Sequence, residues 1–158
     1  MLHRHLLATA DQATVSAYYL AGVTVGVLPW GAAKDWAFSV IEALDTPPIE
    51  VIEIASANSR VSAIDALGPA SAGGEQQTAG RWLLADLEAQ LAALSITPMQ
   101  AARSAMQVVQ ATALPQDAWY AFDALDDELQ LAVNGAFGTP EQIGQEILPA
   151  LREHSSAA

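Results

Sequence analysis

The chain of 158 residues contains no cysteine and only one lysine, Lys34. The lack of cysteine excludes disulfide bonds, thiolate zinc sites and a cysteine nucleophile. Six basic residues oppose eighteen acidic ones, and the net charge of −12 argues against binding of nucleic-acid phosphates and against docking on anionic lipid. Aromatic residues are also few, at 6%, but hydrophobic residues reach 52%. This apolar content is enough to build a core and excludes a wholly disordered chain.

No uncharged segment of the sequence is apolar enough to predict a membrane span. The longest such segment, residues 13–33, contains Pro29 and several glycines, whereas a spanning helix needs about 20 predominantly apolar residues. Asp11 and Gln12 interrupt the N-terminal sequence before any apolar segment, which is not typical of a secretory signal peptide. We therefore expect a cytoplasmic protein that does not act on membranes.

Helix-forming signals dominate the chain. Alanine, the strongest helix former, occupies 33 positions, and no continuous period-two strand pattern occurs. Thr-Pro pairs begin at Thr46, Thr97 and Thr139, where threonine can cap a helix and proline can occupy its first position. Gln100 and Gln142 would complete capping boxes at the second and third pairs. The sequence predicts an all-α fold with helices at about residues 13–26, 30–44, 47–57, 59–67, 75–95, 98–113, 115–134 and 140–154.

These helices are expected to form a single compact domain over residues 1–158, with seven to eight helices and mostly antiparallel neighbours. Residues 1–12 and 155–158 are expected to be flexible ends. Residues 68–74, rich in glycine and other small residues, are expected to form a flexible loop. One apolar row in the fifth helix should face the core: Leu83, Leu84, Leu87, Leu91 and Leu94.

Residues that support catalysis or metal binding do not occur in a recognisable pattern. The three histidines lie near the chain ends, and neither a nucleophile elbow nor a phosphate-binding loop occurs. Asp126, Asp127 and Glu128 are consecutive, so on a helix their side chains point about 100° apart and cannot converge on one cation. We therefore predict a non-enzymatic protein with no catalytic, cofactor-binding or metal-binding residues.

Acidic residues are concentrated in the last third of the chain. Between Ser104 and Leu151 there are seven acids and no base. The acids are Asp117, Asp123, Asp126, Asp127, Glu128, Glu141 and Glu146. Like charges on one helix repel each other, and nothing basic in the segment compensates. The segment is either a solvated face that aids solubility or a docking surface for a basic protein partner.

A helical wheel of residues 115–134 separates a core face from an outward face. The core face is predicted to contain Ala118, Phe122, Leu125, Leu129, Ala132 and Val133. Tyr120 and Leu131 point outward beside Asp117, Asp123 and Asp127, and an apolar centre with a charged rim is typical of protein interfaces. These five residues are therefore the predicted partner-binding residues. The alternative is that Tyr120 and Leu131 pack under another helix of the same domain.

A resemblance to a known class of proteins is carried by two neighbouring segments. Residues 36–41 read Trp-Ala-Phe-Ser-Val-Ile, and residues 47–54 read Pro-Pro-Ile-Glu-Val-Ile-Glu-Ile. This order resembles small acidic helical bacterial immunity proteins, which are encoded beside polymorphic or contact-dependent toxins, and the Ala-Phe-Gly at residues 136–138 is compatible with it. The resemblance implies a non-enzymatic inhibitor that binds a toxin domain. The alternatives are a small regulatory or scaffold domain without a toxin partner and an enzyme that uses carboxylates.

Overall fold

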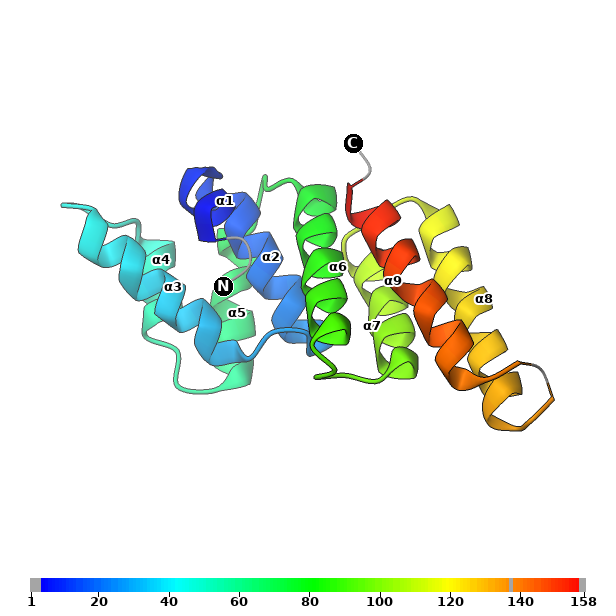
Figure 1. Ribbon diagram of the computed structural model, residues 1–158. Helices are drawn as coiled ribbons and strands as arrows, with labels where there is room; N and C mark the ends of the chain where they lie inside the picture. Colours follow the sequence, from blue (N-terminus) through cyan, green and yellow to red (C-terminus); the bar gives the residue numbers. More distant parts are fainter. Residues whose placement is uncertain (1–3, 137, 157–158) are drawn as a thin grey trace. The chain divides into compact units, whose positions relative to one another are not determined.

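The computed structural model describes residues 4–136 and 138–156, and within these residues the protein contains helices and no strand (Figure 1). The helices are α1 (Arg4–Thr9), α2 (Gln12–Val25), α3 (Trp30–Ala43), α4 (Ile49–Ala55), α5 (Arg60–Ala70), α6 (Gln76–Ala92), α7 (Pro98–Ala111), α8 (Gln116–Val133) and α9 (Pro140–Ser156). The predicted all-α class is confirmed. None of the described helices is both long enough and apolar enough to span a membrane.

Contacts between residues gather into two compact units, residues 1–79 and 80–158. Helix α6 begins in the first unit and continues in the second. The expectation of one domain over the whole chain stays a prediction, and the two units are described in turn.

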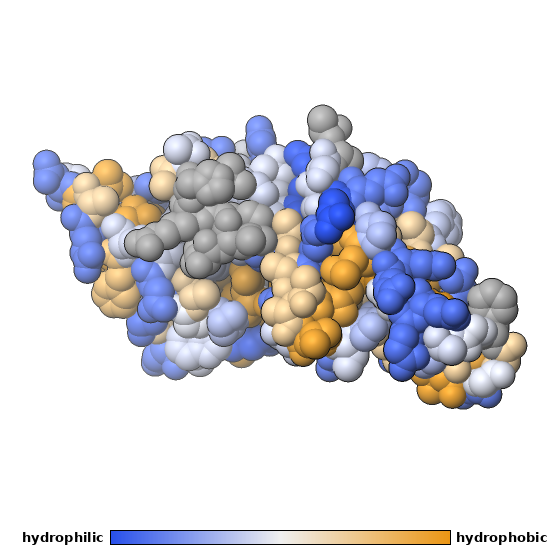
Figure 2. Space-filling view, in the orientation of Figure 1, coloured by the Kyte–Doolittle hydropathy of each residue, from blue (hydrophilic) through white to orange (hydrophobic). Residues whose placement is uncertain are grey.

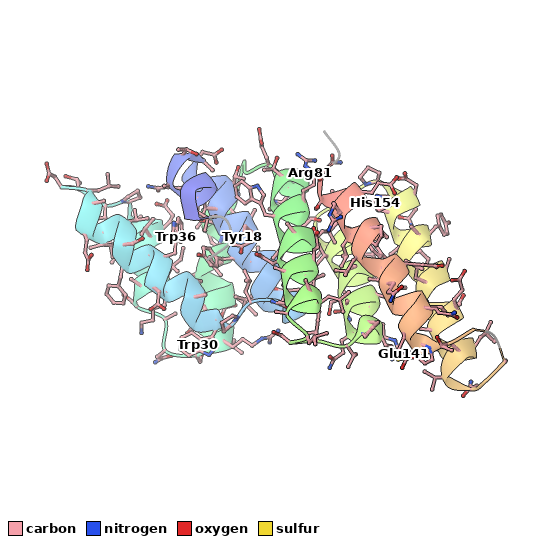
Figure 3. All side chains as sticks on the ribbon, in the orientation of Figure 1. Tyr18, Trp30, Trp36, Arg81, Glu141 and His154 are labelled. Carbon is pink, nitrogen blue, oxygen red and sulfur yellow. The ribbon has the colours of Figure 1, made fainter. Side chains whose placement is uncertain are left out.

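Helix α2 forms the centre of the first unit. It packs against α3 and α5, while α4 packs against α3 and α5. Nearly every side chain in the middle of α2 is buried, including Tyr18 and Tyr19, which are 1% and 0% exposed. The helix ends at Gly26, whose φ of 92° lies in the left-handed region that glycine adopts without steric cost. In Figure 3 the Trp36 side chain of α3 lies toward α2, and its ring stacks on Tyr19 with centroids 5.5 Å apart.

A polar network fixes the start of α2 to the segment that precedes α6. Asp11 caps α2, because its carboxylate accepts hydrogen bonds from the Thr14 backbone N–H at 2.8 Å and from the Thr14 hydroxyl at 2.9 Å. The Glu75 N–H donates to the same hydroxyl at 3.0 Å. A Cβ at Gly74 would overlap the backbone of Ala13, so only glycine fits this approach. The link between α5 and α6 is therefore held against the beginning of α2.

The second unit contains α6 from Gly80 onward together with α7, α8 and α9. The last three helices pack against one another and run in alternating directions (Figure 1). The largest buried side chains of these three helices include Phe122, Ile147 and Leu151. Two glycines allow close approach of the backbone. A Cβ at Gly80 in α6 would overlap the side chain of Thr112, and a Cβ at Gly144 in α9 would lie 2.8 Å from Pro98 Cγ. Small residues at these positions therefore set the spacing of the helices.

Two of the three predicted Thr-Pro starts are confirmed. The Gln100 N–H donates to Thr97 Oγ1 and the Thr97 N–H to Gln100 Oε1, and Thr139 and Gln142 exchange the same pair of bonds. The start at Thr46 is wrong, because α4 begins at Ile49 with Pro48 as its cap. A residue that precedes proline is pushed out of the helical region. Since Pro47 precedes Pro48, it cannot be the first residue of a helix.

Other boundaries also differ from the sequence predictions. Residues 4–9, within the expected flexible end, form α1 and bury Leu7. Helix α5 continues through Gly68 and Pro69 to Ala70, where a loop was expected. Helix α6 ends at Ala92, so Leu94 lies beyond it, with a φ of 60° and 87% exposure, and does not join the core. The other four leucines of the predicted row are buried. Residues 155 and 156, in the other expected flexible end, belong to α9. Residues 1–3 and 157–158, also expected to be flexible, lie outside the described residues.

Candidate functional site

Helix α8 contains all five predicted partner-binding residues, and most of them are exposed. Tyr120 is 63% and Leu131 47% exposed, so neither packs under another helix of the described chain. Asp117 and Asp127 are exposed, and Asp123 is half-buried. Tyr120, Asp127 and Leu131 recur at helical spacing and therefore share one side of α8. We call these five residues, Asp117, Tyr120, Asp123, Asp127 and Leu131, the α8 face.

The opposite side of α8 packs on α7 and α9. Ala118, Phe122, Leu129 and Ala132 are buried, as the wheel predicted, and Leu125 is half-buried. The prediction for Val133 is wrong, because this residue is 62% exposed. It is the last residue of the helix, immediately before the turn at Asn134, where no further helical turn continues the packing. The His154 ring of α9 meets Phe122 edge-on, with centroids 5.6 Å apart, and adds to this core.

An aromatic pair stiffens the α8 face. The rings of Trp119 and Tyr120 meet edge to face, with centroids 5.5 Å apart and planes at 86°. Trp119 is half-buried, so it restricts the Tyr120 ring from one side while the rest of that ring faces solvent. An aromatic side chain that is already ordered loses little conformational entropy when a partner covers it.

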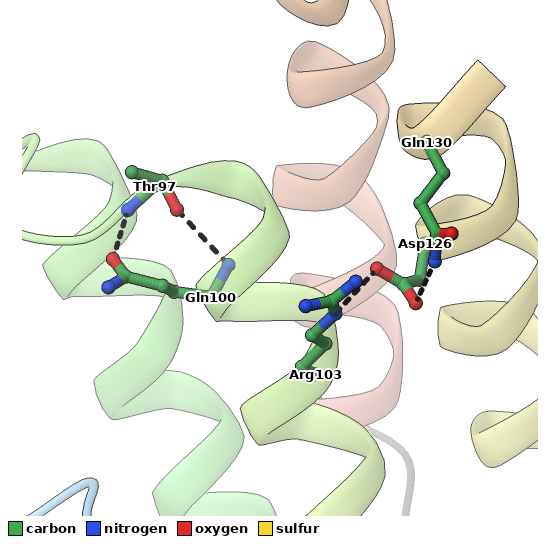
Figure 4. A network of polar contacts seen from close by, with 5 residues as sticks. All are labelled: Thr97, Gln100, Arg103, Asp126 and Gln130. Carbon is green, nitrogen blue, oxygen red and sulfur yellow. Dashed lines mark hydrogen bonds and ion pairs between the residues drawn. The ribbon is translucent and has the colours of Figure 1, made fainter. Parts of the chain in front are cut away.

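Asp126 differs from the other acids of α8 because it is buried and paired. Its carboxylate lies 3.1 Å from Arg103 Nε of α7 and accepts a second hydrogen bond from Gln130 Nε2 at 3.1 Å (Figure 4). The segment contains no base, as the sequence shows, but a base outside it compensates this residue. Arg103 lies 23 residues away, just outside the segment, and no local pattern links the two. The pair joins α8 to α7, and the buried Asp126 is therefore not part of the α8 face.

Most of the positive charge is engaged in internal contacts. Lys34 Nζ donates to the Ala57 carbonyl at 2.7 Å, just beyond the end of α4. Arg60 donates to the carbonyls of Val23 and Thr24 at the end of α2. Both cations thus lie at helix C-termini, where the helix dipole favours positive charge. In the second unit, Arg152 pairs with Glu88 at 3.0 Å.

The acids, in contrast, are largely exposed. Beyond the α8 face they include Asp35, Glu42, Asp45, Glu50, Glu53, Asp65, Glu141, Glu146 and Glu153. In the view of Figure 2, hydrophilic side chains cover much of α9 and the neighbouring part of α8. The exposed surface of the described residues is therefore strongly negative, and a positively charged protein would be attracted to it.

Among the described residues, no group of three or more histidine, aspartate or glutamate side chains is placed to hold a metal ion. Asp123 and Asp127, separated by one helical turn, lie on the outside of α8 rather than in a pocket. An exposed pair of this kind is common on helices and provides no enclosed site for acid–base chemistry.

Comparisons of the chain with protein-family models, with curated proteins and with solved structures find no match.

Proposed function

We propose that the protein is a non-enzymatic binding protein that neutralises a bacterial toxin by covering a basic surface of the toxin domain with the α8 face. The observation that carries this proposal is the exposure of Tyr120 and Leu131 on the same helix as Asp117 and Asp127. An exposed apolar centre beside carboxylates matches the composition of an interface core with a charged rim.

The two kinds of side chain have separate roles in this mechanism. The carboxylates of Asp117, Asp123 and Asp127 attract a basic toxin over several ångströms and raise the association rate. Tyr120 and Leu131 lose water when the partner covers them, so they slow dissociation. Inhibition is steric and electrostatic, because the covered basic surface of the toxin can no longer reach its own substrate.

The proposed function predicts that a gene beside this one encodes a toxin domain, and that domain is the partner for the test. We expect one-to-one binding in surface plasmon resonance and protection of cells that produce both proteins. Asp123→Lys with Asp127→Lys should fold normally, because Asp127 is exposed, Asp123 is only half-buried, and surface substitutions change stability by about 0.5 kcal/mol or less. The same variant should associate more slowly and show a weaker salt dependence.

A charge-matched control separates local from general electrostatics. Glu42→Lys with Glu53→Lys alters two exposed acids of α3 and α4 and changes the net charge by the same amount. It should slow association less than the α8 variant does. Equal slowing by both variants would contradict docking at the α8 face.

Tyr120→Ala should act mainly on dissociation, which we expect to speed up by a factor of about 30 or more if the ring is a buried anchor. Val133→Ala is the apolar control, since Val133 is equally exposed but lies on another side of α8. Binding of both α8 variants at parental rates would place the docking face elsewhere. A toxin domain that neither binds the chain nor is neutralised by it would refute the function and favour a regulatory or scaffold domain.

A further inference from the structure

A groove opens in the first unit among α1, α2 and α3 and has a volume of about 610 Å³. Its walls are mostly apolar and are formed by Leu7 of α1, Val15 and Tyr19 of α2, and Trp36, Val40 and Leu44 at or beside α3. Cavities of roughly 300–1,000 Å³ with mainly apolar linings are typical of small-molecule sites. None of the five residues of the α8 face lines this groove.

The floor of the groove is rigid. Val15 and Tyr19 are 1% and 0% exposed, and the Tyr19 ring stacks on Trp36 with planes at 28°. Tyr18 meets Tyr19 edge-on, with centroids 5.0 Å apart, and holds the same ring from another side. Trp36 itself is half-buried, so part of its indole remains open to the groove. A ligand would therefore meet an aromatic surface that is already in place.

One carboxylate, that of Asp35, lines the groove, and two more acids are adjacent in sequence to lining residues. Asp35 is exposed and has no ion-pair partner among the described residues. Asp11 stands between two lining residues, Ala10 and Gln12, and its hydrogen bonds from Thr14 lower the pKa of its carboxyl, which keeps it ionised. Asp45 directly follows the lining residue Leu44.

No described basic side chain lines the groove to balance these charges. Lys34 precedes Asp35 in the sequence, but its ammonium group is held by the Ala57 carbonyl near the end of α4. The groove thus combines an apolar interior, a partly open indole and one lining carboxylate, that of Asp35. This combination favours a ligand with an apolar body and a single positive charge.

We propose that this groove binds a small organic cation, an amine or quaternary ammonium compound that carries an alkyl or aryl group. The apolar group lies against Trp36, Val40 and Leu44, which line the groove and are not fully buried, and displaces water from them. The cationic group lies at the Asp35 side, where it gains from the carboxylate and from the face of Trp36.

Three probes with the same alkyl chain test the proposal: octyltrimethylammonium, octanol and octyl sulfate, each below the concentration at which it forms aggregates. Binding is followed by tryptophan fluorescence and by amide chemical shifts of the full chain. We expect saturable binding of the cation with shifts at Leu7, Val15 and Val40, weaker binding of octanol and none of octyl sulfate. Equal binding of cation and anion, or shifts outside the groove, would overturn the proposal.

The role of Asp35 is isolated by a matched pair of variants. Asp35→Asn should weaken binding of octyltrimethylammonium by about threefold to tenfold and leave octanol unchanged. Asp65→Asn removes the same charge from an exposed position of α5 that does not line the groove, and it should alter neither affinity by more than about twofold. Equal weakening by both variants would mean that the cation responds only to the net charge of the chain. Trp36→Leu should weaken binding of octyltrimethylammonium more than binding of octanol. An equal loss of affinity for both probes would exclude the indole as a cation partner.

Discussion

Arg103 of α7 and Asp126 of α8 form an ion pair of 3.1 Å although they are 23 residues apart in the chain. The Asp126 side chain is only 10% exposed and that of Arg103 is 53% exposed. The buried carboxylate therefore depends on Arg103 and Gln130 for the hydrogen bonds that water would otherwise supply.

Removing the arginine should consequently destabilise the protein. We expect Arg103→Ala to lower the free energy of unfolding by about 1–3 kcal/mol, because a buried charge loses its partner. Arg152→Ala is the control, since the Arg152–Glu88 pair has a similar length but is more exposed. Arg152→Ala should lower the free energy of unfolding by less than about 1 kcal/mol. Urea unfolding measures both, and an equal effect of the two substitutions would show that burial of Asp126 does not matter.

The three Thr-Pro pairs provide an internal comparison of capping. Thr97→Ala and Thr139→Ala should each lower the free energy of unfolding by about 0.5–2 kcal/mol, because each removes an acceptor for a first-turn N–H. Thr46→Ala should have almost no effect, since α4 begins after Pro48. Loss of stability in Thr46→Ala comparable to that in the other two would contradict the observed start of α4.

Close packing at Gly80 predicts a steric effect. In Gly80→Ala the added methyl group would overlap Thr112, which is fully buried, and would lie 2.9 Å from Leu114 Cδ1. We expect a loss of about 1–3 kcal/mol from this overpacking. Gly31→Ala in α3 is the control, because no heavy atom lies within 4 Å of the added Cβ. There alanine should be neutral or should stabilise by up to about 1 kcal/mol, as measured by thermal and urea unfolding.

Asp11 gives a prediction for pH. The hydrogen bonds from Thr14 lower the pKa of Asp11 in the folded chain relative to the unfolded chain. This carboxylate therefore contributes stability above its unfolded pKa of about 3.9, and the contribution is lost as the pH falls through the folded value. Asp11→Asn keeps a capping oxygen but no charge. Between about pH 6 and pH 2 the free energy of unfolding should fall less for Asp11→Asn than for the parent. Parallel curves of this free energy against pH would contradict the lowered pKa of Asp11.

Local signals in the sequence predicted most helix boundaries and the side of α8 that faces outward. The starts of α7 and α9 depend on residues three positions apart. Helical periodicity predicted the side of α8 on which Tyr120 and Leu131 lie, and the structure then showed that no other described helix covers them. The residues of a capping box, and the residues of one helix face, are close together in the chain. Both features can therefore be predicted from a single sequence.

Features that depend on distant parts of the chain could not be predicted in this way. The partner of Asp126 lies on another helix, and the need for glycine at position 80 comes from Thr112. The groove beside Trp36 exists only because three helices leave space between them. The wrong helix start after Thr46 had a local cause. Pro48 disfavours a helical conformation of the preceding residue, Pro47, so α4 begins only at Ile49.

The internal use of basic side chains also affects how copies of this protein behave toward one another. Lys34, Arg60, Arg103 and Arg152 contact groups of their own chain, so two molecules that approach each other present mainly carboxylates. At low ionic strength this repulsion should keep the apolar side chains Tyr120 and Leu131 of different copies apart, and light scattering should give a positive second virial coefficient. In 1 M salt the screening length falls to about 3 Å, and the coefficient should decrease toward zero. We therefore expect the carboxylates beside its exposed apolar side chains to keep crowded solutions of the protein dispersed.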